Sequence, residues 1–247
     1  MTRAARVAAL YDVHGNLAAL QAALAEARAL GAELVVFGGD VAWGAFPREA
    51  LELVMDPGLP ALHVRGNADR SVAEPGDETP EWVEEITRWC HERLDDRHRT
   101  FLLDQSESVA VSVDGLGDVL FCHGSPRSDE ESLTVLTPED RLRQAVADVQ
   151  QGTMVCGHTH MQFDRTAGDK RVVNAGSVGM PYEGAPGAYW ALLSDTVSLR
   201  RTPYDYDAAA AAVASSGCPH AEELAKDVLA PPPRDETARR FEGPAPE

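Results

Sequence analysis

Five groups of polar side chains able to bind metal ions each follow a short apolar segment. In the first group, an apolar run over 7–10 leads into Asp12, His14 and Asn16. The run predicts a buried strand whose C-terminal end carries a carboxylate and an imidazole, followed by a sharp turn into a helix over 17–30. Asp and His two positions apart on one turn can bind the same metal ion. A polar turn in which Asn16 caps the helix explains the same residues.

Four later groups repeat this arrangement. Apolar strand-like segments end at Gly39-Asp40, Gly66-Asn67-Ala68-Asp69, His123-Gly124 and Gly157-His158-Thr159-His160. Open α/β sheets bind ligands beyond the C-terminal ends of their strands, so these side chains are expected to converge there. Together they supply two carboxylates, one amide oxygen and four imidazoles, which is more than one tetrahedral zinc ion needs. The set suits two metal ions with a bridging carboxylate, and it comprises Asp12, His14, Asp40, Asn67, His123, His158 and His160.

In their order along the chain, these groups resemble the motifs of the calcineurin-like metallophosphoesterases, over roughly residues 5–201. In size the chain resembles the small phosphodiesterases of bacteria and archaea. The resemblance implies an α/β fold, a four-layer α/β/β/α sandwich of two mixed sheets. It also implies that one metal ion is held by Asp12, His14, Asp40 and His160, and a second by Asp40, Asn67, His123 and His158. Such nitrogen and oxygen ligands suit Mn, Fe, Ni, Co or Zn.

The activity that the resemblance implies is hydrolysis of a small phosphate ester, most readily a diester, by attack of metal-bound hydroxide. Asp40 and Asn67 would belong to the catalytic centre together with Asp69, which would orient water or hold its loop. Many family members have a histidine after the asparagine, which helps to protonate the leaving group, whereas this chain has Ala68. A general acid contributes roughly 10²–10⁴-fold. The change therefore predicts weaker activity that depends on a good leaving group.

Three further residues are candidates for contact with the substrate. Arg70 and Arg127 each follow a ligand-bearing loop, and arginine is well suited to bind phosphate oxygens. Asn16 lies at the N-terminus of the first helix, where an anion is favoured. Either arginine could equally form a surface salt bridge. The expected partner is a small phosphate ester, with a nucleotide as one candidate.

Other functions are compatible with the same motifs. A phosphomonoesterase or a nucleotide pyrophosphatase would need the same metal centre. A catalytically weak or inactive metal-binding scaffold for protein partners is a further alternative, because the retromer subunit with this fold also lacks the histidine. A scaffold would expose an apolar patch away from the metal ions, and the segment with Trp82 and Trp89 is the candidate.

The charge of the chain restricts its partners. The formal net charge is −18, from 40 acidic and 22 basic residues. Such a surface repels nucleic-acid polymers and anionic membranes. No apolar run approaches the roughly 20 residues that span a bilayer, and no signal-peptide pattern is evident, so a cytoplasmic location is expected. The oligomeric state is left open.

The element pattern predicts one domain over residues 1–230, with a disordered, proline-rich tail at 231–247. A helical insertion is expected at about 71–105 and a helical C-terminal extension at about 204–230. The insertion carries His91 and His98, seven positions apart, which predicts a solvated helix face. A lid over the site is the alternative, because the insertion begins directly after the loop with Asn67.

Overall fold

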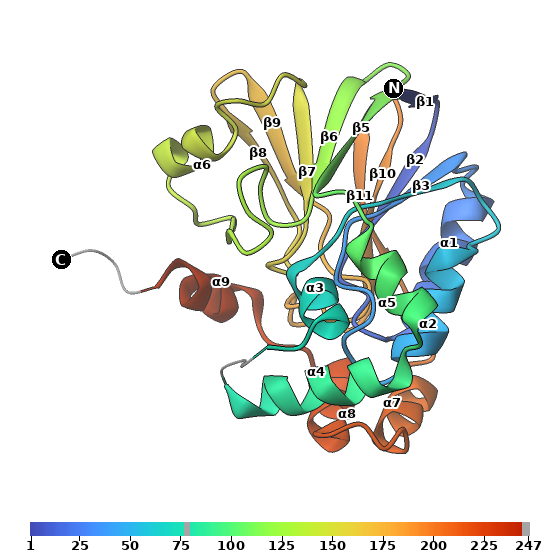
Figure 1. The fold of residues 1–247 in the computed structure, drawn as a ribbon. Helices are drawn as coiled ribbons and strands as arrows, with labels where there is room; N and C mark the ends of the chain where they lie inside the picture. The colour runs from blue at the N-terminus through green and yellow to red at the C-terminus, as the bar shows by residue number, and fades with distance from the viewer. Residues whose placement is uncertain (77–79, 244–247) are drawn as a thin grey trace.

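Two β-sheets lie face to face in the computed structural model, which describes residues 1–76 and 80–243 (Figure 1). Both sheets contain parallel and antiparallel neighbours. The six-stranded sheet has the order β1 (Thr2–Ala4), β5 (Ser108–Val113), β6 (Gly117–Cys122), β7 (Thr153–Cys156), β9 (Lys170–Asn174) and β8 (Phe163–Ala167). The five-stranded sheet has the order β11 (Val197–Thr202), β10 (Ala188–Leu193), β2 (Val7–Leu10), β3 (Leu34–Phe37) and β4 (Ala61–His63).

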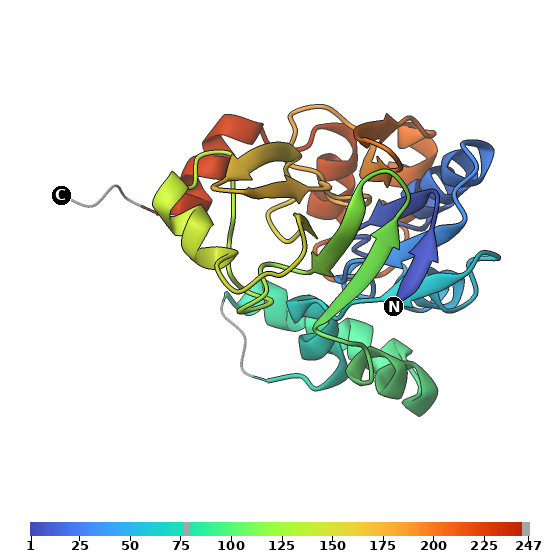
Figure 2. The ribbon, with the colours of Figure 1, turned by 90° about the horizontal axis from the view of Figure 1, so that it is seen from above.

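Helices cover the outer faces of both sheets and one end of the molecule (Figures 1 and 2). The five-stranded sheet packs against α1 (Leu17–Ala29), and the helices gathered beside it are α2 (Pro47–Met55), α3 (Asn67–Ala73), α4 (Glu81–Arg93), α5 (Asp96–Leu103), α7 (Tyr206–Ala214) and α8 (Ala221–Leu229). The six-stranded sheet packs against α6 (Glu139–Ala145). The predicted four-layer sandwich of two mixed sheets is confirmed.

The central strands are buried on both faces, which explains their unbroken apolar runs. In β2, Val7 and Ala9 pack between the two sheets, whereas Ala8 and Leu10 pack on the side of the helices. β2 pairs in parallel with β3, and β3 pairs in parallel with β4. In the other sheet β6, β7 and β9 are also parallel neighbours. The carboxyl ends of these strands therefore lie at one edge of each sheet.

The predicted disordered tail is wrong for the part of it that the structure describes. Helix α9 (Arg234–Glu242) begins after Pro233 and lies beside the strand ends (Figure 1). The carboxylate of Glu242 accepts hydrogen bonds from the hydroxyls of Thr134 and Thr137 at 2.6 and 2.5 Å. It also pairs with Arg141 at 3.0 Å. These partners lie about a hundred positions earlier, so the composition of the tail does not reveal them. Residues 244–247 lie outside the described part.

The described part of segment 71–105 contains helices α4 and α5, but its two histidines do not share a solvated face. His91 belongs to α4, where its Nδ1 lies 2.9 Å from the carbonyl oxygen of Val72. His98 belongs to the separate helix α5 and is 1% exposed. The prediction of a solvated face is therefore wrong for His98, because the chain turns between α4 and α5. Among the described helices, none combines the length and apolar character needed to cross a membrane.

Candidate metal centre

The seven predicted ligands meet where the strand ends of the two sheets approach each other. Their atoms form two groups, within each of which the ligand atoms lie within 4.8 Å of one another, namely Asp12, His14, Asp40 and His160, and Asp40, His123 and His158. Asn67 joins the second group, because its Oδ1 lies 3.1 Å from Nε2 of His123. These are the two sets that the sequence motifs predict, and Asp40 belongs to both. Their role as metal ligands stays a prediction that this geometry supports.

Backbone strain is concentrated at these residues. Six non-glycine residues of the described chain have positive φ, and five of them are the predicted ligands Asp12 (53°), His14 (45°), Asp40 (56°), His158 (65°) and His160 (58°). Such conformations cost of order 1–3 kcal/mol each and persist only where the surroundings impose them. The surroundings here are backbone hydrogen bonds between the loops. The amide of Asp12 donates to Gly39 O at 3.0 Å, and that of His14 donates to Asp40 O at 2.9 Å.

Two histidines are oriented by backbone carbonyl groups. Nδ1 of His123 lies 2.8 Å from the carbonyl oxygen of Gly38, and Nδ1 of His160 lies 2.6 Å from that of Met180. A carbonyl oxygen only accepts, so each Nδ1 carries the proton and donates it. Each Nε2 then faces the other predicted ligands, and its lone pair becomes available to a metal ion once the ring is neutral. This arrangement is the usual support of histidine ligands to a metal ion.

The two carboxylates keep oxygens free for a cation. Oδ2 of Asp12 accepts from the amide of His158 at 3.0 Å, whereas its buried Oδ1 has no hydrogen-bond partner among the described residues. Oδ1 of Asp40 accepts from the amide of Ala68 at 2.8 Å, and its Oδ2 lies 3.4 Å from Nε2 of His123. A buried carboxylate oxygen without a partner is costly. The donor set and this free oxygen therefore fit a divalent metal ion.

Burial and mutual charge shift the pKa values of these groups in opposite directions. Burial raises the pKa of Asp12 well above its usual value. Burial acts in the same sense on Asp40, but the neighbouring histidines, His123 foremost, together outweigh it and keep the pKa of Asp40 low. Burial lowers the pKa of His123, yet Asp40 and Asp12 together raise it to about 10. Burial and the charge of His123 lower the pKa of His158 to about 4. Without a metal ion, His123 is thus protonated at neutral pH, and its positive charge offsets the negative charge of Asp40.

We expect metal binding to release a proton from His123. Its Nε2 must be unprotonated to act as a ligand, so binding of Mn²⁺ at pH 7.5 should release about one proton or more, and the apparent affinity should rise with pH. Calorimetric titration of metal-stripped protein in two buffers with different heats of ionisation measures this release. Equal heats of binding in both buffers would contradict the expectation.

Asp69 is buried beside the predicted metal ligands and accepts backbone hydrogen bonds. One of its oxygens accepts from the amides of Val41 and Ala42 at 2.8 and 3.1 Å. Burial raises its pKa to about 6, with the charge of Asp40 adding to the effect. Of the two roles predicted for Asp69, these contacts support holding the loop: it ties the chain after β3 to α3.

The three residues predicted to contact the substrate form hydrogen bonds or ion pairs with other residues of the protein. Asn16 caps α1 by accepting from Ala19 N at 3.1 Å, and it donates to Gly179 O at 3.0 Å. The guanidinium group of Arg70 pairs with Asp129 and Glu130, and that of Arg127 pairs with Glu131. Both arginines line a cavity that contains none of the predicted metal ligands. Phosphate contact by these residues stays a prediction, and their present partners would compete with it.

A cavity of about 210 Å³ lies directly beside the predicted metal ligands. Aromatic rings form much of its wall, from Trp43, Trp82, Tyr182 and Phe241. Tyr182 stacks on the predicted ligand His160, with ring centroids 4.6 Å apart. Sequence analysis did not identify this wall, because its residues come from four distant segments. Two weak sequence signals were available. Trp43 follows shortly after Asp40, and Tyr182 follows shortly after the glycine-rich loop over 174–179.

Comparison with known proteins bears out the resemblance. The family model of the calcineurin-like phosphoesterase superfamily domain matches residues 6–196. The chain belongs to this superfamily. An uncharacterized protein of Methanocaldococcus jannaschii is 27% identical over 224 residues, which cover 81% of this chain and 88% of that protein. The family predicted from the five motifs is thereby confirmed.

Two solved structures share the fold of this chain over most of its length. A metallophosphoesterase from Sphaerobacter thermophilus has a TM-score of 0.74 at 24% identity, covering 91% of this chain and 98% of that one. A hypothetical protein from Pyrococcus horikoshii OT3 has a TM-score of 0.81 at 21% identity, covering 92% and 99%. The match extends past the sandwich, so much of the added helical structure belongs to the shared fold.

Proposed function

We propose that this protein is a dinuclear metal-dependent phosphodiesterase that hydrolyses a small phosphate ester. The observation that carries the proposal is the pair of ligand groups that share Asp40. Two divalent ions bound there would lower the pKa of water and offset negative charge on the phosphate oxygens. Asp40, with one oxygen held by the Ala68 amide, would contribute to the binding of both ions.

The side chains around the centre support a diester over a monoester. No arginine or lysine lines the cavity beside the predicted ligands, as far as the described residues go. The protein itself thus offers no cationic side chain to a second phosphate charge, and a diester carries one charge fewer than a monoester dianion. Ala68 supplies no proton to the leaving group, so esters of acidic alcohols and phenols should react fastest.

The position of Trp82 weighs against the scaffold alternative. Its side chain is 45% exposed, as expected for a docking surface. However, its ring lies 6.0 Å from that of Trp43, and both rings line the cavity beside the predicted metal ligands. The exposed tryptophan thus belongs to the rim of the site and not to a separate patch.

Hydrolysis of two chromogenic esters tests the proposal. Metal-stripped protein is supplied with Mn²⁺, Ni²⁺, Zn²⁺ or Mg²⁺ in turn and given bis(p-nitrophenyl) phosphate or p-nitrophenyl phosphate. We expect metal-dependent hydrolysis in which the diester reacts faster than the monoester. A faster monoester would favour the monoesterase alternative. No turnover by protein shown to be folded and metal-loaded would contradict the proposal.

A further inference from the structure

A second cavity, of about 380 Å³, adjoins the one beside the predicted metal ligands. The two cavities share the lining residues Trp43, Trp82, Met180 and Tyr182, so they lie side by side. We call the second cavity the outer subsite, and its remaining lining residues are His220, Glu223, Leu224 and Asp227. A substrate whose phosphate lies at the metal centre would extend one of its ester arms into this subsite.

Aromatic rings at right angles form the inner wall of the outer subsite. The rings of Trp43 and Trp82 lie 6.0 Å apart at 70°, and Trp82 lies 6.4 Å from the ring of His220 at 75°. Trp82 leaves 45% of its surface exposed at this opening. The exposed surface of Trp82 can contact a bound group, and the negative π face of an indole ring attracts a cation.

The other end of the outer subsite is acidic. Asp227 is about half-buried, and burial raises the pKa of its carboxyl group. No hydrogen bond or ion pair of this carboxylate occurs within the described part of the chain. Glu223, one turn away on α8, has Lys226 at 3.9 Å, and that lysine side chain is 73% exposed. No arginine or lysine lines the outer subsite among the described residues.

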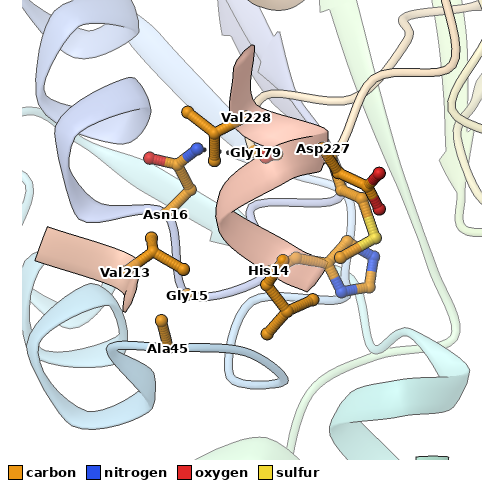
Figure 3. Close-up of a pocket in the computed structure, with 10 residues that line it drawn as sticks. His14, Gly15, Asn16, Ala45, Gly179, Val213, Asp227 and Val228 are labelled. Atoms are coloured by element: carbon orange, nitrogen blue, oxygen red, sulfur yellow. Dashed lines mark hydrogen bonds between the residues drawn. The ribbon is translucent and has the colours of Figure 1, made fainter. Parts of the chain in front are cut away.

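Asp227 lies between the outer subsite and the turn that carries the predicted ligand His14, because it lines a cavity on each side. It lines a small cavity together with His14 and Asn16, on the side of α8 that faces the turn after β2 (Figure 3). Glu223, Asp227 and His220 do not converge on a common point as the metal ligands do. In the described chain, the groups of three or more such ligands within 4.8 Å are the two at the metal centre. A metal ion is therefore a poor occupant, and a larger cation with diffuse charge fits better.

We propose that the outer subsite binds the alkylammonium arm of a phosphodiester of an amino alcohol. The proposal rests on the proposed phosphodiesterase function and names its class of substrate. Aromatic rings with nearby carboxylates are the usual means of recognising quaternary ammonium groups. The resulting site has two poles: the phosphate lies at the metal centre, and the cation lies between Trp82 and Asp227. A nucleobase would also stack on the rings, but it carries no positive charge to pair with Asp227.

A pair of esters that differ only in charge tests the proposal. One is p-nitrophenyl phosphorylcholine, and the other is its 3,3-dimethylbutyl analogue, in which carbon replaces the quaternary nitrogen. Hydrolysis of either ester forms a P–O bond from water, breaks the P–O bond to p-nitrophenolate and releases a proton. We expect the metal-loaded protein to favour the choline ester by about tenfold in kcat/KM. Equal rates for the two esters would overturn the proposal.

Variants on α8 locate the effect. In Asp227→Asn, the ratio of the two kcat/KM values should fall toward one, because the carboxylate that pairs with the cation is lost. Glu222→Gln is the matched control, since Glu222 is an exposed acid on the same helix that does not line the outer subsite. The control should keep the ratio of the unaltered protein. A ratio unchanged in Asp227→Asn, or lost equally in Glu222→Gln, would contradict the assignment to Asp227.

Binding of choline alone gives a readout that needs no metal ion. Choline chloride should change the tryptophan fluorescence of metal-stripped protein in a saturable way, and 3,3-dimethylbutanol should not. The change should be lost in Trp82→Leu, with folding checked by circular dichroism. Choline binding without hydrolysis of any ester would retain the outer subsite and reject the proposed function. Hydrolysis of both esters at equal rates would retain the function and reject the cationic substrate.

Discussion

An Asp40→Asn variant is expected to lose phosphodiester hydrolysis almost completely, by about 10³-fold or more in kcat/KM. Asp40 is the residue shared by both ligand groups, so its loss affects both metal positions. An amide keeps the shape of the side chain and can still accept the hydrogen bond from Ala68, but it removes the negative charge. Hydrolysis of bis(p-nitrophenyl) phosphate and metal content after dialysis, measured by plasma mass spectrometry, check this result.

The matched control for this variant is Asp118→Asn. Asp118 is an exposed acid on β6 with no ion pair in the described part of the chain, so the same change of charge there should leave activity and metal content unaltered. The thermal transition of each metal-stripped variant shows whether folding is preserved. Two bound metal ions and undiminished turnover in a folded Asp40→Asn variant would reject the shared-ligand assignment.

A Gly179→Ala variant is expected to destabilise the protein by about 3 kcal/mol and to weaken metal binding. A Cβ atom at this position would lie 1.7 Å from the carbonyl oxygen of Val13 and 2.9 Å from Cβ of Asn16. The loop before it is fixed to the same turn, because the hydroxyl of Ser177 donates to Asp12 O at 2.7 Å. One methyl group therefore pushes the glycine-rich loop away from the turn that carries two predicted ligands.

Chemical denaturation of metal-stripped protein measures the change in the free energy of unfolding, and titration with Mn²⁺ measures the loss of affinity. Gly152→Ala is the control, since a Cβ at Gly152 would have no atom within 4 Å and its φ is not positive. That variant should be at least as stable as the unaltered protein, because alanine restricts the unfolded chain. A Gly179→Ala variant of normal stability and metal affinity would show that the loop moves without cost.

Several features of this protein follow from local sequence patterns. Strands β2 and β3 are buried on both faces, and each appears in the sequence as an unbroken apolar run. Asp12 follows shortly after the first run, and Asp40 follows shortly after the second. The helix cap at Asn16 is also a local feature, and its side chain accepts from Ala19 as expected. Because each motif combines a strand end with a predicted ligand, the order of motifs established the family resemblance, and that resemblance implied both the fold and the grouping of the predicted ligands.

Other features depend on contacts between distant segments. Helix α9 has few apolar residues, and its segment was predicted to be disordered. The carboxylate of Glu242 nevertheless accepts hydrogen bonds from Thr134 and Thr137, and these bonds hold the helix in place. Arg70 and Arg127 follow ligand-bearing loops in sequence, but nearby carboxylates pair with them in the folded chain. The arrangement of charges around a loop depends on which side chains the fold brings there, and spacing along the chain does not encode it.

The sequence by itself determined the candidate metal-binding groups of this protein, because each predicted ligand follows a strand whose position the local pattern specifies. Only the tertiary structure decided which side chains surround these groups. Trp43, Trp82 and Tyr182 come from a loop, an inserted helix and the segment after the glycine-rich loop, and they meet Asp227 of α8 only when these layers pack together. Such a wall has no period and no fixed spacing, since its residues are neighbours in space and not along the chain.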